Sequence, residues 1–330
     1  MPLYTSVPIN DPNLHDQKEA KEVSQEELKH YITSYPITSS LRFMRFVCFI
    51  VFLGPFRLIS CIISLILFFI TVSVLGTIGK LPFIKDKRKY KNWASKITYI
   101  SERLCLLSVG IVYISLNGEI KPETRTIVSN HLTMVDPVSL LSQIPVSYLV
   151  MSGLKGNPFF SQTSKIYDII YVDRSKKEGI TQQVCDFQNN PNILPLTIFP
   201  EGKVTNGECV LGFRSGGFVN NTPVQPVTLR YKLWFCPRDM ATISWVSDDT
   251  LEYIYQLFSI PFITLEVNIL DPIKWEKPDM TPQEKANQAE LIIANSLGCL
   301  ALKNTNKEIF QKHLMNEKKD GNEQAKEKAD

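Results

Sequence analysis

The sequence predicts an α/β fold, a mixed sheet with flanking helices, preceded by an N-terminal membrane-embedded helical segment or hairpin. Two observations support this fold class. From Val109 onward, short runs rich in β-branched residues alternate with helical stretches, and each run is apolar throughout, as in strands that helices bury on both faces. A long uncharged segment lies ahead of the first run. The runs are VGIVYISL, TRTIVSN, YDIIYVDR, ILPLTIF, PVQPVTLRY and FITLEVNIL.

Both ends of the chain are expected to be tails. The 330 residues are 44% hydrophobic and 21% charged, which is the composition of a folded protein. The polar runs DQKEAKEVSQEELK and NEKKDGNEQAKEKAD near the ends offer too few apolar groups to offset the entropy lost on ordering. We therefore expect a disordered polar tail over residues 1–40 and a charged disordered tail over residues 303–330.

Residues 41–80 are expected to anchor the chain to a membrane. Residues 58–79, LISCIISLILFFITVSVLGTIG, carry no charge, and a bilayer core is crossed by about 20 apolar residues. Residues 41–53 are a second apolar stretch, interrupted by Arg42 and Arg45, and Gly54-Pro55 separates the two. The anchor is therefore one span or a helical hairpin that enters one leaflet. A helix buried in a soluble core rarely stays uncharged over this length.

A basic stretch follows the apolar segment. Six lysine or arginine residues lie between Lys80 and Lys91. Cations beside a membrane segment favour the cytoplasmic side and attract anionic headgroups at about 1 kcal/mol each. We therefore expect the folded domain, residues 81–302, to lie on the cytosolic face. A solvated charge run without a membrane role is the alternative.

Charge and cysteine spacing exclude two kinds of partner. A net charge of +3, evenly mixed with acidic residues, is too small for a nucleic-acid surface. The seven cysteines are scattered, without a CxxC pair or nearby histidines, so we expect no metal site and interpret them as small buried side chains in a reducing compartment. Loops of the GxGxxG and GxxxxGKS/T types are absent, which argues against nucleotide-binding sites of those classes.

A helix near the C-terminal end is indicated by its capping signals. Thr281-Pro282-Gln283-Glu284 offers a capping box with proline at the first helical position. Apolar residues then follow at helical spacing and are expected to pack on the sheet. These residues are Ala286, Ala289, Ile293, Leu297 and Leu300.

His131 is the one histidine inside the expected domain, because the other three histidines lie in the tails. It directly follows the strand-like TRTIVS, and Asp136 and Pro137 come shortly after it. On one continuous helix, a residue five positions on is rotated by about 140°, so His131 and Asp136 would not lie on the same face. The two side chains can meet only if the chain turns between them. Across a turn, the Asp136 carboxylate can accept the Nδ1 proton and leave Nε2 free to take a proton from a hydroxyl. The alternative for Asp136 is a helix N-cap ahead of Pro137.

Two further strand ends bring charged residues to the same edge of the sheet. The run ILPLTIF leads into FPEG, which carries Glu201, and Arg174 closes the run YDIIYVDR. The planar donors of Arg174 are suited to gripping a phosphate. Taken singly, Glu201 is equally compatible with a solvated carboxylate, and Arg174 with a surface salt bridge.

Together these strings resemble, in order and spacing, the glycerolipid acyltransferase family over about residues 57–302. The family's NHxxxxD block, strand-closing arginine and FPEG block are met by Asn130, His131, Asp136, Arg174, Phe199, Pro200, Glu201 and Gly202. An apolar strand with the turn PVQP, residues 223–226, meets the fourth block. The stretch EGKVTNGECVLGFRSGGFVNNTPVQPVTLRY is most similar to lysophospholipid acyltransferases that act on choline or ethanolamine lipids. Two positions depart from the usual pattern, Lys203 in place of threonine and Thr133 in place of serine.

The resemblance implies acyl-CoA-dependent transfer of a fatty acyl group to the free hydroxyl of a lysophospholipid, lysophosphatidate or glycerol phosphate. It also implies a role in phospholipid synthesis or remodelling. His131, oriented by Asp136, is implied as the general base, and backbone donors near the turn as the stabilisers of the oxyanion. Arg174 and the FPEG turn around Glu201, with Asn130 beside them, are implied to hold the acceptor. Acyl-CoA is then a co-substrate, and no cofactor or metal is required.

The implied partners are acyl-CoA, the lysophospholipid or glycerol phosphate acceptor and a bilayer, with no nucleic acid. The implied location is the endoplasmic reticulum membrane, with the lipid droplet and the Golgi as further candidates. One alternative is a non-catalytic lipid-droplet or endoplasmic reticulum scaffold with an acyltransferase-like domain, which the intact first and third blocks disfavour. Another is a lipid hydrolase, for which the GxSxG elbow is missing from the sequence.

Overall fold

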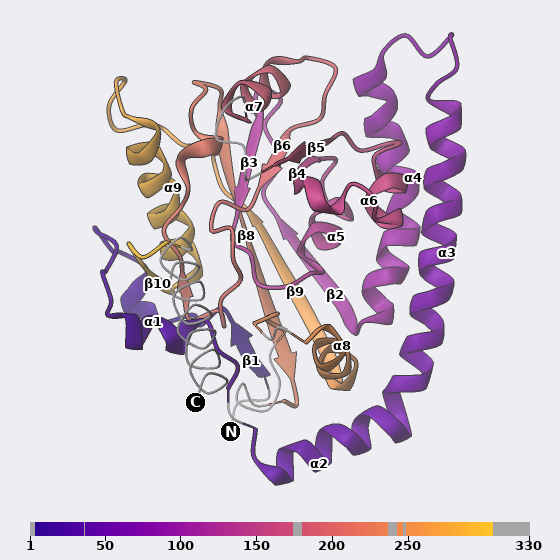
Figure 1. Ribbon diagram of the computed structural model, residues 1–330, viewed down its shortest axis with the longest axis vertical. Helices are drawn as coiled ribbons and strands as arrows, with labels where there is room; N and C mark the ends of the chain where they lie inside the picture. Colours follow the sequence, from indigo (N-terminus) through magenta and orange to yellow (C-terminus); the bar gives the residue numbers. More distant parts are fainter. Residues whose placement is uncertain (1–3, 36, 174–179, 237–242, 247–248, 306–330) are drawn as a thin grey trace, which may run out of the picture.

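A computed structural model describes residues 4–35, 37–173, 180–236, 243–246 and 249–305 of the chain (Figure 1). The main sheet has the strand order β2-β9-β8-β3-β6-β4-β5, and β1 pairs with the far end of β8. Its strands are β1 (Tyr4–Val7), β2 (Ile111–Asn117), β3 (Thr126–Ser129), β4 (Ser147–Met151), β5 (Ile169–Val172), β6 (Leu196–Ile198), β8 (Val224–Trp234) and β9 (Phe262–Ile269). A second small sheet joins β7 (Cys209–Val210) to β10 (Leu300–Ala301).

The main sheet is mixed, as predicted. Strand β8 is antiparallel to β9 and to β1, whereas the pairs β2–β9, β3–β8, β3–β6, β4–β6 and β4–β5 are parallel. The parallel strands β3, β4, β5 and β6 therefore end at one edge of the sheet, where α/β folds place their functional groups. The predicted class, an α/β mixed sheet with flanking helices, is confirmed.

Helices cover both faces of the sheet. On β3, Ile127 is buried in a core that also holds Leu106 of α4 (Lys87–Ser108) and Leu257 of α8 (Thr250–Ser259). Its neighbour Val128 is buried in a separate core with Ile293 of α9 (Pro282–Leu297). Successive side chains of a strand point to opposite faces, so both sides of β3 must be apolar. This explains why the strand runs are apolar throughout. The shorter helices α5 (Asp136–Leu141), α6 (Pro158–Thr163) and α7 (Ile180–Asn189) join these strands.

The expected C-terminal helix is α9, and its capping box is present. The Thr281 side chain accepts a hydrogen bond from the Glu284 amide, and the Glu284 carboxylate accepts one from the Thr281 amide at 2.7 Å. The helix ends at Leu297 because Gly298 adopts a left-handed conformation with φ of 61°. The expectation for Leu300 was therefore wrong, since this residue lies in β10 beyond the helix end.

Residues 4–35 are folded, which corrects the prediction of a disordered tail over residues 1–40. Strand β1 pairs with β8, and α1 (Gln25–Tyr31) begins at the N-cap Ser24. Val23 and Leu28 are buried against Cys209, Leu211 and Leu302. These few apolar residues order a polar segment because they cover a surface that the rest of the domain provides. Of the tail predicted over residues 303–330, residues 306–330 lie outside the described residues, and Asn304 is buried.

The expected anchor forms α2 (Ser39–Val47), a π-helical turn (Cys48–Leu53) and α3 (Gly54–Ile78). Within the described residues, α3 is the one helix whose length and composition would allow it to cross a membrane. It packs antiparallel on α4 at one side of the molecule (Figure 1). Five of its apolar side chains repeat at helical spacing along one face, and each is more than half exposed. They are Phe56, Ile59, Ile63, Ile66 and Ile70.

Arg57 fastens the start of α3 to the domain. Its guanidinium donates to the carbonyls of Phe258, Ile260 and Pro261 at 2.9, 2.5 and 2.7 Å, in and just after the last turn of α8. A cation at this position satisfies carbonyls that the helix end leaves without partners. Gly110 lies against the same guanidinium, and a Cβ there would come within 2.4 Å of an Arg57 nitrogen.

We predict that Gly110→Ala lowers the melting temperature of the detergent-solubilised protein. Gly110 has φ of 92°, which is strained for alanine, and the added methyl would displace Arg57. The matched control is Gly153→Ala, where nothing lies within 4 Å of the added carbon. Equal melting temperatures for the two variants would show that the contact between Arg57 and Gly110 does not constrain the fold.

Candidate active site

The turn after β3 is attached to the neighbouring strand by Asn130. Its side-chain amide donates to the Leu229 carbonyl at 3.0 Å, and its side-chain oxygen accepts from the Leu229 amide at 2.8 Å. The side chain is buried. Asn130 therefore fixes the turn to β8, and its expected part in binding the acceptor stays a prediction.

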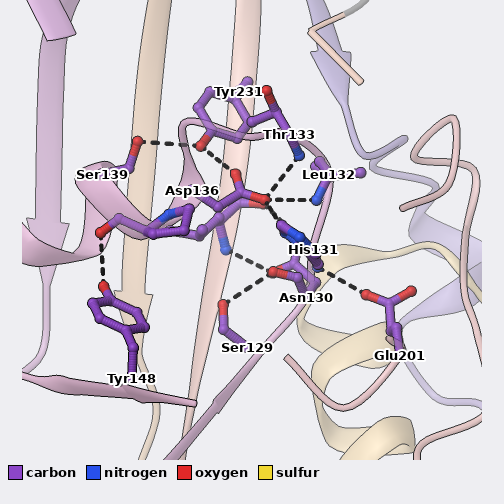
Figure 2. Close-up of polar contacts among 12 residues, drawn as sticks. Ser129, Asn130, His131, Leu132, Thr133, Asp136, Ser139, Tyr148, Glu201 and Tyr231 are labelled. Atoms are coloured by element: carbon purple, nitrogen blue, oxygen red, sulfur yellow. Dashed lines mark hydrogen bonds and ion pairs between the residues drawn. The ribbon is translucent and has the colours of Figure 1, made fainter. Parts of the chain in front are cut away.

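The buried Asp136 carboxylate organises this turn (Figure 2). Its Oδ2 accepts hydrogen bonds from the amides of Leu132 and Thr133 at 2.7 and 2.9 Å. Its Oδ1 accepts one from the Tyr231 hydroxyl of β8 at 2.6 Å. Burial raises the pKa of the Tyr231 phenol well above its usual range, which keeps this hydroxyl protonated as a donor. Asp136 is the first residue of α5 rather than its N-cap, because the turn closes before the helix begins.

The same carboxylate oxygen contacts the His131 ring. Nδ1 of His131 lies 2.8 Å from Oδ2 of Asp136, so the turn expected between the two residues is present. The geometry suits the tautomer in which Nδ1 carries the proton and Nε2 is a free base. Phe199 stacks on the imidazole with centroids 4.5 Å apart, and the His131 side chain is 24% exposed. The ring is therefore held on one edge and one face, yet remains accessible.

Glu201 is buried and its carboxylate binds backbone amides. Oε1 accepts from the His131 amide at 2.8 Å, and Oε2 accepts from the Leu211 amide at 3.0 Å. Burial raises the pKa of Glu201 to about 8, although both amide hydrogen bonds act to lower it. Oε1 thus ties the FPEG turn to the histidine turn and Oε2 ties it to Leu211, while contact of Glu201 with the acceptor stays a prediction.

The other residues of the FPEG block shape that turn. Pro200 is buried, and its carbonyl accepts from the Arg214 amide at 3.1 Å. Gly202 donates to the Phe199 carbonyl at 3.2 Å and has φ of 68°, a conformation that favours glycine. Arg174, the expected phosphate ligand, lies outside the described residues.

A cavity of about 430 Å³ opens beside His131, Phe199 and Gly202. Most of its lining is apolar and comes from α5, β4, α6 and β5. This part of the lining includes Leu141, Val150, Phe159, Phe160 and Ile169, and Leu154 is added from the short turn between β4 and α6. A mainly apolar cavity with polar side chains such as His131 at its edge suits a ligand with a hydrocarbon tail.

The sequence analysis did not identify two supporting residues, Tyr231 and Trp245. Trp245 donates its backbone amide to the Leu132 carbonyl at 2.8 Å, and its side chain lines the cavity. A phenol inside the apolar run PVQPVTLRY was a usable signal for Tyr231, because a buried hydroxyl requires a partner. Trp245 had no such signal in the sequence. Within the described ranges, no group of three or more His, Cys, Asp or Glu side chains could hold a metal ion.

Comparisons with known proteins agree on one family. Residues 116–230 match the sequence profile of the family described as Acyltransferase. The chain is 28% identical over 250 residues to lysophospholipid acyltransferase LPEAT2 of Arabidopsis thaliana, a match that covers 70% of this chain and 44% of that protein. It is 28% identical over 320 residues to lysophosphatidylcholine acyltransferase 2B of Rattus norvegicus, covering 89% and 58%. The chain thus spans about half the length of these relatives.

The fold is also similar to that of a solved structure. This is the crystal structure of the 1-acyl-sn-glycerophosphate acyltransferase PlsC from Thermotoga maritima, with a TM-score of 0.52 and 13% sequence identity. The match covers 73% of this chain and 94% of that chain. At this identity the similarity supports the fold alone.

We predict that Glu201→Gln destabilises the protein. A glutamine has one acceptor oxygen, and its NH2 group would face an amide that needs an acceptor. An unsatisfied buried donor costs about 1–3 kcal/mol, so the melting temperature should fall by several degrees. The control is Glu123→Gln, because Glu123 is exposed. An unchanged melting temperature in Glu201→Gln would show that the two amide contacts contribute little.

Proposed function

We propose that the chain is a member of the glycerolipid acyltransferase family and transfers a fatty acyl group from acyl-CoA to a lysophospholipid hydroxyl. The proposal extends to lysophosphatidate and glycerol phosphate as alternative acceptors. The observation that carries the proposal is the His131 imidazole, held by Asp136 at the end of an apolar cavity. Because acylation of a lysophospholipid yields a diacyl phospholipid, the proposed reaction belongs to phospholipid synthesis or remodelling.

In the proposed reaction, Nε2 of His131 takes the proton of the acceptor hydroxyl as that oxygen attacks the thioester carbonyl. The Asp136 carboxylate stabilises the imidazolium that forms, and the contact at Nδ1 fixes the tautomer. The tetrahedral intermediate then collapses, the C–S bond breaks, and the coenzyme A thiolate leaves and accepts the proton from the imidazolium. The acyl group passes directly from sulfur to oxygen without an acyl-enzyme.

Three backbone amides of the histidine turn already have acceptors within the protein, so the oxyanion donors expected near the turn are other groups. The amide of His131 donates to Glu201, and the amides of Leu132 and Thr133 donate to Asp136. These donors hold the catalytic turn in shape. The donors that stabilise the oxyanion must therefore come from elsewhere around the cavity or from the substrate.

The cavity wall contacts the expected membrane anchor, which supports delivery of the substrate tails from a bilayer. Phe159 of α6 lines the cavity, and its ring stacks on Phe68 of α3 with centroids 5.8 Å apart. On its other side α3 presents the exposed apolar row from Phe56 to Ile70. We propose that this row contacts lipid, so that long acyl chains reach the cavity without crossing water.

We further propose that the domain faces the cytosol at the endoplasmic reticulum membrane, where acyl-CoA is available. The basic stretch after α3 supports this orientation. Two of its lysines make contacts within the protein: Lys87 of α4 donates to the Gly79 carbonyl at the end of α3 at 2.7 Å, and Lys91 of α4 pairs at 2.6 Å with Asp168, which directly precedes β5.

We predict that His131→Ala reduces acyl transfer at least a hundredfold, because general base catalysis contributes about 10²–10⁴ in rate. The assay is thioester cleavage of acyl-CoA coupled to acceptor acylation, with equal amounts of folded protein. His15→Ala is the matched control, since His15 is exposed on the N-terminal segment and hydrogen-bonds to Asn10. Activity of His131→Ala within tenfold of the unmodified protein would exclude His131 as the base.

We predict that Asn220, which begins the glycosylation sequon Asn220-Asn221-Thr222, stays unglycosylated in a eukaryotic host. A cytosolic domain does not meet the glycosylation machinery, although Asn220 lies in a partly exposed loop. Mobility before and after glycosidase treatment measures this, and a version targeted to the lumen by a cleavable signal is the positive control. A glycosidase-sensitive shift that Asn220→Gln abolishes would place the domain in the lumen.

A further inference from the structure

A second cavity lies beside α9, away from the catalytic turns. It has a volume of about 580 Å³ and shares no described residue with the cavity at His131. The N-terminal segment, the loop after β7 and the first half of α9 surround it. Its lining includes Lys18, Glu19, Gly212, Gln283, Asn287 and Glu290. Helix α9 lies at the opposite side of the molecule from α3 and α4, so this cavity is remote from the proposed lipid contact (Figure 1).

Glu290 brings a buried carboxylate to this cavity, and the residue is only 2% exposed. Its Oε2 accepts a hydrogen bond from the Phe213 amide at 3.1 Å. Its Oε1 is buried and has no hydrogen-bond partner in the part of the chain that the structure describes. Burial raises the pKa of Glu290 to about 8, although the amide contact acts to lower it. A buried acceptor without a donor costs free energy, so this oxygen is suited to accept a donor from a ligand.

The charge of Glu290 has no counterion among the described residues. The ion pairs of that part of the chain do not include Glu290. Of the two lysines in the lining, Lys18 pairs with Asp16, and Lys303 is exposed. Glu19 is an exposed carboxylate in the same lining. The rim of the cavity therefore carries both signs of charge, whereas its buried end is selective for a cation.

We propose that this cavity binds a water-soluble compound through a primary ammonium group that donates to Oε1 of Glu290. An ammonium supplies both the missing donor and the missing charge, and charge-assisted hydrogen bonds are about twice as strong as neutral ones. A hard metal ion prefers several oxygen ligands, and Glu290 is the one buried carboxylate in the lining. A lipid headgroup can carry the same ammonium group, but the position of α9 opposite α3 favours a soluble source.

Binding at Glu290 is expected to stabilise a segment that also holds the FPEG turn. The amides of Leu211 and Phe213, two residues apart, donate to Glu201 and Glu290 respectively. A ligand that binds the folded carboxylate and not the unfolded chain raises the free energy of unfolding. The melting temperature is therefore a direct readout of occupancy.

The test compares ethanolamine with choline as probes of the detergent-solubilised full chain. Both are two-carbon amino alcohols, but the three methyl groups on the choline nitrogen remove its N–H donors. One variant is Glu290→Gln, which keeps an acceptor for the Phe213 amide and loses the charge. The matched control is Glu19→Gln, because Glu19 lines the same cavity and is exposed. The melting temperature as a function of probe concentration gives the dissociation constant.

We expect ethanolamine to raise the melting temperature of the unmodified protein and choline to bind roughly tenfold or more weakly. Glu290→Gln should weaken ethanolamine binding by a similar factor, whereas Glu19→Gln should bind it as the unmodified protein does. Binding should strengthen as the pH rises from about 6.5 to about 8.5. The reason is that the ammonium pairs with the ionised carboxylate, and the pKa of Glu290 is raised to about 8.

Three results would overturn the inference. They are no stabilisation by ethanolamine, equal stabilisation by the two probes, and unchanged ethanolamine binding in folded Glu290→Gln. If Glu290→Gln does not fold, the comparison of the two probes on the unmodified protein still decides. Stabilisation by phosphatidylethanolamine micelles without an effect of free ethanolamine would assign the cavity to a lipid headgroup and overturn the soluble source. These measurements do not require acyl transfer, so they are independent of the proposed function.

Discussion

The Asp136 carboxylate is the interaction on which the rest of the site depends. A buried charge is costly unless hydrogen bonds replace its hydration, and here the donors are two backbone amides, the Tyr231 hydroxyl and the His131 ring. Hydrogen bonds to charged groups are worth about 1.5–3 kcal/mol each. The same contacts that stabilise the carboxylate therefore close the turn and orient the imidazole. The imidazole therefore reaches its oriented position when this turn folds.

A second buried carboxylate extends this arrangement to the neighbouring turn. Glu201 joins the His131 amide to the Leu211 amide, and the FPEG turn then brings Phe199 onto the imidazole and Lys203 to the cavity. Most of the motif residues thus hold the two turns in place, because they are buried and hydrogen-bonded to backbone groups. His131 is the motif residue that both lines the cavity and carries a base. Helix α3 contacts α6, whose residues Phe159 and Phe160 line the cavity.

The sequence predicted those features that depend on local pattern. Apolar strand runs predicted the α/β sheet, the capping box predicted α9, and the spacing from His131 to Asp136 predicted a turn. It failed where the answer depends on distant residues. The Glu201 carboxylate accepts hydrogen bonds from the amides of His131 and Leu211. The sequence around Glu201 does not predict either contact, because His131 lies on another strand end and Leu211 lies ten residues further on. The N-terminal segment is polar and has no core of its own, so its sequence predicts disorder, yet it folds on a surface formed by Leu211 and Leu302.

The tautomer of His131 tests the role of Asp136 most directly, because it can be measured without substrate or turnover. The measurement is the pair of ring 15N chemical shifts of His131 in protein labelled at histidine, recorded at about pH 9, well above the usual histidine pKa of about 6.5. With four histidines in the chain, the spectrum of His131→Ala assigns the signal. We expect a protonated Nδ1 and an unprotonated Nε2, and Asp136→Asn should change this pattern. A His131 ring protonated at Nε2 in the unmodified protein would contradict the proposed role of Asp136.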